Sequence, residues 1–86
     1  MQIRQELRQF VIDNFLFGRD GELQDGESFL ENGIIDSTGV LELIAFLEER
    51  FGLELEETDL TPENLDSIDK VTTLVESRLA AAKGVA

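Results

Sequence analysis

Residues 36–52 of the chain read DSTGVLELIAFLEERFG, and this segment predicts an amphipathic helix with a signal at each end. Asp36 or Ser37 can cap the free amides of the first turn, and Gly52 is a typical C-terminal stop. We therefore expect a helix over residues 37–51. Its core-facing stripe recurs every three or four residues: Val40, Leu43, Ile44, Leu47 and Phe51.

Three further segments predict helices. Residues 2–16 and 67–82 each carry apolar residues at every third or fourth position, which is typical of helices packed on a core. The Thr-Pro-Glu sequence at 61–63 is a helix start, but an Asp-Ser cap follows so closely that only a short helix over 61–66 is expected. The expected fold class is therefore all-α, a bundle of three main helices and one short helix.

The segment before the central helix, residues 18–36, is rich in Gly and Asp, which break regular structure. We expect a long ordered loop here, with a helical turn near Ser28–Glu31. Because 86 residues can support one modest core, a single domain over 1–86 is expected. Four apolar side chains are expected to fix the loop to that core: Leu23, Phe29, Leu30 and Ile34.

The composition disfavours most catalytic and metal chemistry. The chain has no Cys and no His, so it lacks a thiolate, the commonest general base and the commonest metal ligand. Neither catalytic residues nor a metal site are expected. No signal peptide and no run of roughly 18 apolar residues is visible, so we expect a cytoplasmic monomer without a membrane span.

The negative charge of the chain is large and unevenly distributed. The formal net charge is −12, and sixteen of the nineteen acidic residues lie between Asp20 and Asp69, where Arg50 is the single base. Because such a surface repels phosphates, nucleic acid is not an expected partner. A basic protein surface would be attracted, although a face that confers only solubility would have the same composition.

The predicted central helix has a second face, opposite its core stripe. This face would present one exposed Leu within a ring of carboxylates, which suits docking by a basic partner. A lone exposed Leu is also common without any function. We call this set of residues the acidic face: Thr38, Leu41, Glu42, Ala45, Glu48 and Glu49.

Ser37 stands at the start of the same helix and has two interpretations. As a cap it would be purely structural. As a nucleophile it would need an adjacent base, which the chain does not offer, but it can be the substrate of another enzyme that brings its own base and metal. Gly39, two residues later, is a poor helix former, which suggests close approach by another chain or ligand, or tolerance near a helix end.

Residues 29–43, FLENGIIDSTGVLEL, resemble the attachment motif of acyl and peptidyl carrier proteins. The later sequences LEERF at 47–51 and LTPEN at 60–64 continue the resemblance, which covers nearly the whole chain. It implies an acyl-carrier-like bundle in which Ser37 receives phosphopantetheine from coenzyme A through a phosphodiester. Asp36 matches the residue that precedes this Ser in the family.

The resemblance also implies a role and partners. A freestanding carrier, not itself an enzyme, would hold acyl or aminoacyl groups as thioesters on the arm's thiol and shuttle them between biosynthetic enzymes. Expected partners are a phosphopantetheinyl transferase, an acyl- or aminoacyl-loading ligase, and synthases or transferases with basic surfaces that dock on the acidic face. Thr38 replaces the family's usual Leu and leaves the choice of partner open. The cargo stays open among fatty acid, polyketide, peptide-synthetase-like and D-alanine pathways.

Two other functions are alternatives to the carrier role. An EF-hand loop read from Asp20 has acids at positions 1, 3 and 12, but Asp25 occupies position 6, which needs Gly, and Glu27 occupies the usually apolar position 8. There is also no second loop to pair with it. An unmodified acidic helical adaptor fits every feature except the Asp36-Ser37 context.

Overall fold

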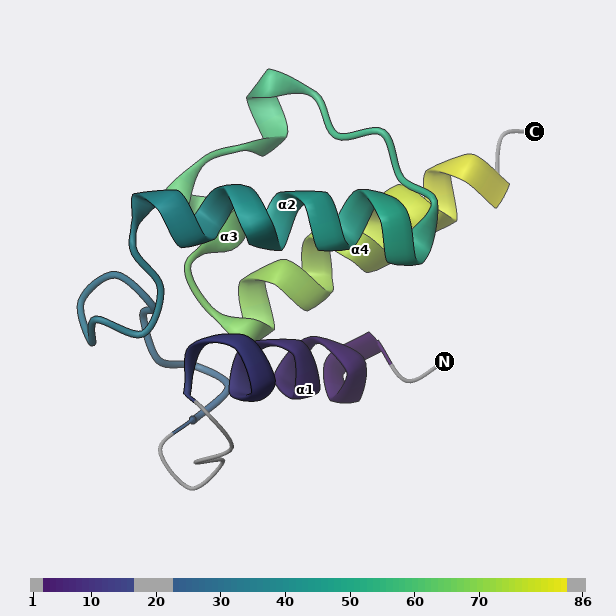
Figure 1. Ribbon diagram of the computed structural model, residues 1–86. Coiled ribbons are helices and arrows are strands. Elements are labelled where there is room, and N and C mark those ends of the chain that lie inside the picture. Colours follow the sequence, from purple (N-terminus) through teal and green to yellow (C-terminus); the bar gives the residue numbers. More distant parts are fainter. Residues whose placement is uncertain (1–2, 17–22, 84–86) are drawn as a thin grey trace.

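The computed structural model describes residues 3–16 and 23–83, with side chains to residue 81, and every regular element within them is a helix (Figure 1). The expected all-α class with three main helices and one short helix is confirmed. The predicted helix start at Gln2 and the loop residues 17–22 lie outside the described residues. The elements are α1 (Ile3–Phe15), α2 (Ser37–Phe51), a 3₁₀ helix (Glu57–Asp59), α3 (Pro62–Leu65) and α4 (Ile68–Lys83).

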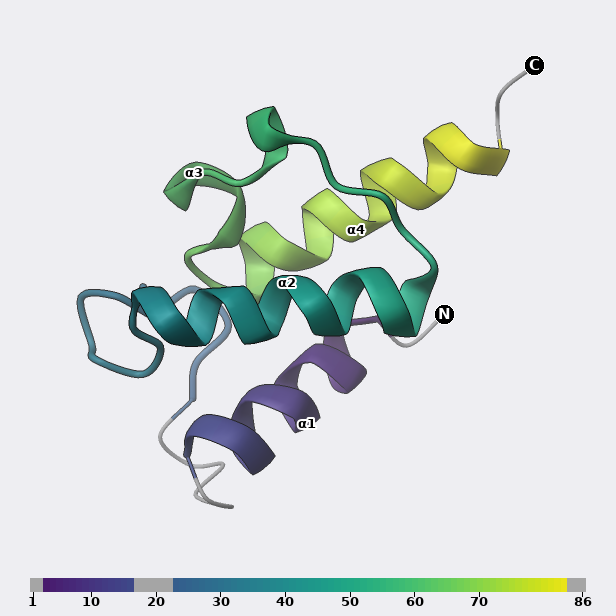
Figure 2. The ribbon, with the colours of Figure 1, turned by 45° about the horizontal axis from the view of Figure 1, so that its top comes forward.

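The three long helices surround one core. α1 runs in the opposite direction to α2 and α4 in both views (Figures 1 and 2), and α4 packs against α1 and α3. The start of α2 therefore lies at the same end of the bundle as the loop before it and α3. No helix within residues 3–16 and 23–83 has the length and apolar character needed to cross a membrane. The most deeply buried side chains are Leu7, Val11, Phe29, Ile35, Leu43, Leu47, Ile68, Val71 and Val75.

α1 and α2 approach each other closely at Gly39. A Cβ atom at this position would lie 2.8 Å from Cε1 of Phe15 and 2.9 Å from Cγ2 of Ile35, well inside van der Waals contact. Glycine is therefore needed because the Phe15 ring packs across the first turn of α2. The close approach suggested by the sequence is made here by a residue of the same chain.

An aromatic ladder extends this contact along α1 and α2. The rings of Phe10 and Phe46 stack with centroids 4.1 Å apart, and Phe15 meets Phe10 edge-on at 5.9 Å. Phe51 meets Phe46 edge-on at 6.0 Å. Phe46 was absent from the predicted core stripe, although it lies two helical turns after Gly39 and so faces the same neighbour.

The loop before α2 is anchored partly by the expected side chains. Leu23 and Phe29 are buried as predicted, and Ile34 is half-buried against the core. Leu30 is 48% exposed, whereas Ile35, which was not predicted as an anchor, is buried. The expected helical turn is present, since Asn32 N donates to Ser28 O, four residues earlier, at 3.2 Å. Successive residues of such a turn point about 100° apart. Phe29 is directed into the core, and Leu30 is thereby left at the surface. The prediction for Leu30 was wrong for this reason.

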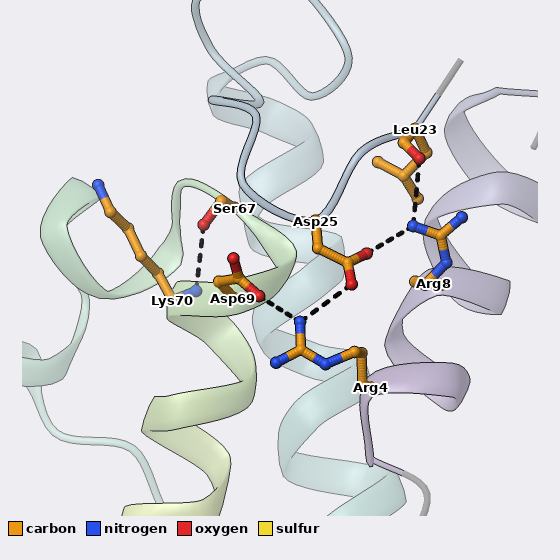
Figure 3. Close-up of polar contacts among 7 residues, drawn as sticks. All are labelled: Arg4, Arg8, Leu23, Asp25, Ser67, Asp69 and Lys70. Atoms are coloured by element: carbon orange, nitrogen blue, oxygen red, sulfur yellow. Dashed lines mark hydrogen bonds and ion pairs between the residues drawn. The ribbon is translucent and has the colours of Figure 1, made fainter. Parts of the chain in front are cut away.

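Two Arg side chains of α1 tie that helix to the loop and to α4 (Figure 3). Asp25 lies between them: Arg8 donates to its Oδ1 at 2.5 Å and Arg4 to its Oδ2 at 3.1 Å. Arg4 also donates to Asp69, a contact that raises the pKa of Arg4 above its usual value. Arg8 donates as well to the carbonyl of Leu23 at 3.1 Å. Arg4 and Arg8, two of the seven basic residues, therefore form ion pairs within the fold.

Candidate functional site

Asp36 and Ser37, which are adjacent at the start of α2, have different roles. Asp36 lies in extended backbone, and its Oδ1 accepts a 2.7 Å hydrogen bond from Gly39 N. Asp36 is therefore the cap, and Ser37 is the first residue of the helix. Of the two caps that the sequence allowed, the structure contains only the carboxylate. At the other end, Gly52 adopts a left-handed conformation and ends α2 as expected.

The Ser37 side chain is exposed and is not used by the fold. Its hydroxyl makes no hydrogen bond to any residue that the structure describes. The first bond of the helical ladder runs from Val40 N to Asp36 O at 3.0 Å, so the amides of Ser37 and Thr38 precede it and remain open. An exposed hydroxyl thus stands beside open amides at the positive end of the α2 dipole, which favours a bound anion.

An apolar cavity of about 220 Å³ lies beside Ser37. Its walls come from three parts of the chain: Leu30 of the loop, Val40 of α2, and the segment from Leu60 to Leu65 that contains α3. Leu30 and Leu60 are 48% and 38% exposed, so they form a partly open apolar rim. The cavity offers a mainly apolar surface next to a hydroxyl, and Asp66 is the one acidic residue among the described residues of its lining.

A second hollow lies at the start of α2 and is also open to solvent. Phe15 and Ile34 form its apolar floor, while Asp36, Thr38 and Glu42 lie around it. Within the described residues, Ser37 therefore lines the apolar cavity, while its neighbours Asp36 and Thr38 line the carboxylate-rimmed hollow.

All six residues of the acidic face are exposed. Among the residues that the structure describes, Leu41 has the most exposed large apolar side chain, at 67%, as the sequence predicted. Glu48 has a second task, because its Oε2 accepts a 3.3 Å hydrogen bond from Leu55 N in the segment after α2. Arg50 pairs with Glu6 of α1 and is therefore directed away from the carboxylates of this face.

Asp66, expected from the sequence to be part of the α4 cap, instead binds the loop that leads to Ser37. Its Oδ1 accepts from Leu30 N at 3.0 Å, its Oδ2 accepts from the hydroxyl of Ser28, and its carbonyl accepts from Phe29 N at 2.8 Å. The cap of α4 is Ser67, whose hydroxyl accepts from Lys70 N at 3.1 Å (Figure 3).

A partly buried ion pair attaches the chain next to the cavity to α4. Asp59 in the 3₁₀ helix is only 6% exposed and accepts from Arg78 of α4. Its Oδ2 also accepts from Glu56 N at 3.0 Å. The Arg78 hydrogen bond, with help from the Glu56 amide, lowers the pKa of Asp59 below its ordinary 3.8, although burial acts in the other direction. This pair attaches the segment before Leu60 to α4.

Known proteins resemble the chain along most of its length. No family model matches it. The acyl carrier protein of Campylobacter hominis is 32% identical over 77 residues, which is 90% of this chain and 94% of the relative. The chain belongs to the carrier protein family. The acyl carrier protein of Chlamydia felis is 32% identical over 79 residues, 91% of this carrier and 96% of the relative. The D-alanyl carrier protein of Lactobacillus acidophilus is 30% identical over 74 residues, 84% and 94% of the two chains.

Several residues that shape this carrier's candidate site were not identified from its sequence. Phe15 comes from α1, Leu60 precedes α3, and Asp66 follows it, so all three are distant from Ser37 along the chain. The Leu-Thr-Pro-Glu-Asn sequence at 60–64 was the available signal, since it marked this segment as part of the resemblance. Helical periodicity alone could not place it beside the start of α2.

Proposed function

We propose that Ser37 is the attachment site of phosphopantetheine, and that the chain carries acyl or aminoacyl groups between enzymes. The observation that supports this most strongly is the exposed hydroxyl of Ser37, which has no partner among the described residues because Asp36 already caps the helix. Bound phosphopantetheine would supply the thiol for thioester chemistry, which a chain without Cys lacks.

The residues around Ser37 suit this group. A phosphodiester is an anion, and the open amides of Ser37 and Thr38 lie at the positive end of α2. The nearby Asp36 carboxylate would repel such an anion, but the Gly39 amide holds that carboxylate in a defined position. On the cavity side, Val40 and Leu30 offer apolar contact to the uncharged part of an attached arm.

We also propose that basic partner enzymes dock on the acidic face. Glu42 and Glu49 would meet Arg or Lys side chains of a partner, and Leu41 would enter a small apolar pocket. Exposed ion pairs contribute about 0–1 kcal/mol each, so the complexes would be short-lived. A short lifetime suits a carrier that must leave its transferase or loading ligase for the next enzyme.

The cargo is open between two chemical classes. The relatives include proteins named for acyl and for D-alanyl groups, with 32% and 30% identity. These values are too similar to favour one class. An acyl intermediate of fatty acid or polyketide synthesis and an activated amino acid are therefore both compatible with the proposed role.

The proposal is tested by incubating the chain with coenzyme A and a broad-specificity phosphopantetheinyl transferase and then measuring intact mass. We expect one added group on the wild type and on Thr38→Ala, which removes the adjacent hydroxyl. Ser37→Ala should remain unmodified. If a folded wild-type sample gains no mass, the proposal is wrong and the unmodified acidic adaptor becomes the better account.

A further inference from the structure

We propose that Asp66 is a positioning residue for Ser37, because it holds the loop that leads into α2 against the junction of α3 and α4. The expected effect on phosphopantetheine transfer rests on the proposed attachment at Ser37. The expected effect on the loop before α2 does not. Asp66 lies outside the attachment motif and outside the acidic face. Its role follows from the three hydrogen bonds that it accepts.

Those three bonds all end on consecutive residues of the turn before α2. The carboxylate of Asp66 accepts from the Ser28 hydroxyl and from Leu30 N at 3.0 Å, and its carbonyl accepts from Phe29 N at 2.8 Å. Two of them depend on the side chain. Hydrogen bonds to an ionised acceptor are stronger than those between neutral groups, so the carboxylate is the main polar link between this turn and the helices behind it.

The same residues form one wall of the cavity at Ser37. Leu30, Asp66 and Ser37 all line it, and Leu30 is attached to Asp66 through its own amide. Leu30 is half exposed and has little core contact to hold it. Without the carboxylate, the segment between Leu30 and Asp36 would retain its anchors in the core, but the rim beside Ser37 would move more freely.

The loss should be local because other groups hold the fold. Phe29 and Ile35 are each only 1% exposed and remain buried on either side of Leu30. Ser67, rather than Asp66, caps α4. Local opening of a segment needs less free energy than global unfolding. Replacing Asp66 should therefore release the rim at temperatures where the bundle stays folded.

The effect of Asp66 on the loop is tested by amide hydrogen exchange of Asp66→Ala, with Glu76→Ala as a control that removes an exposed carboxylate from α4. We expect exchange at Leu30 N to become at least about tenfold faster in Asp66→Ala, with no change at Leu47 in the core. Ser28→Ala, which removes one of the two side-chain bonds, should give a smaller increase. Unchanged exchange at Leu30, or an equal increase at Leu47, would overturn the proposal.

The effect of Asp66 on modification of Ser37 is tested by the kinetics of phosphopantetheine transfer. If the loop is positioned correctly only part of the time, the apparent affinity falls with that fraction. We therefore expect Asp66→Ala to raise the KM of the transferase for the chain about fivefold to tenfold, with kcat unchanged. Asp66→Asn, which keeps an oxygen for Leu30 N, should restore much of the affinity, and Glu76→Ala should behave as wild type.

The effect of Asp66 on the loop and its effect on phosphopantetheine transfer can fail separately. Faster exchange at Leu30 with wild-type KM would overturn the positioning role while leaving the proposed function intact. No transfer to the wild type at all would contradict the proposed function, and the exchange comparison would still decide whether Asp66 holds the loop.

Discussion

The carboxylate of Asp36 accepts a 2.7 Å hydrogen bond from the amide of Gly39, and this bond spares the neighbouring Ser37 hydroxyl from capping α2. Both side chains are chemically able to cap a helix. Because the carboxylate does so, the hydroxyl of Ser37 stays exposed on the first residue of the helix. A fixed backbone with a free side chain is what an enzyme needs in order to modify one residue of a folded protein.

Replacing Asp36 should weaken the start of α2. Asp36→Ala removes the cap and is expected to lower the free energy of unfolding by about 1 kcal/mol, whereas Asp36→Asn should lose much less. Urea denaturation followed by circular dichroism measures both changes. Equal urea midpoints for wild type and Asp36→Ala would contradict the capping role.

Replacing Gly39 should destabilise the fold even though Ala favours helices by about 1 kcal/mol over Gly. The added methyl group would lie 2.8 Å from Phe15, and overpacking of this kind costs about 1–3 kcal/mol. We therefore expect Gly39→Ala to lower the melting temperature. In a Phe15→Leu background the same substitution should cost less. An equal effect in both backgrounds would show that the contact with Phe15 is not the cause.

The Asp59–Arg78 pair should make stability depend on pH. Because folding lowers the pKa of Asp59, its contribution is fully present above the unfolded value near 3.8 and is lost as pH falls through the folded value. Wild type should therefore melt well above Asp59→Asn near neutral pH, and this difference should shrink below about pH 4. Glu76→Gln controls for the change in net charge. A difference that stays constant down to the acid limit would contradict the assigned cause.

Reversing charges on the acidic face should slow loading without unfolding the bundle. Glu42 and Glu49 are suitable because neither has a hydrogen bond or ion pair within the described residues, unlike Glu48, which holds Leu55 N. We expect Glu42→Lys with Glu49→Lys to reduce kcat/KM of the transferase at least about tenfold at low salt, with a smaller effect at high salt. Glu76→Lys on α4 is the matched control. Unchanged kinetics at low salt would rule out docking there.

Periodicity predicted the helices of this chain well, because each long helix buries one stripe of apolar side chains on a single core. The spacing of Leu43 and Leu47 is visible in the sequence without any knowledge of the partner helix. The exposed Leu41 was predicted on the same grounds. Such features depend on the geometry of one helix, which repeats every 3.6 residues.

Contacts between distant segments were not predictable in this way. The bonds from Asp66 to Ser28 and Leu30, and the pairing of Asp59 with Arg78, join residues far apart in sequence, and in so acidic a chain many carboxylates were equal candidates for each partner. Leu30 was misassigned because the sequence does not reveal the direction of a side chain in a single irregular turn. The residue types and spacing identified Ser37, whereas the tertiary fold determines what surrounds it.

The central claim is that the Ser37 hydroxyl itself carries the prosthetic group. Fragmentation mass spectrometry of the modified protein tests this directly, because fragments that separate residue 37 from residue 38 locate the added mass. We predict the group on Ser37 and an unmodified Thr38. The added mass on Thr38 or on any other residue, or its absence from a folded and fully incubated sample, would contradict the account.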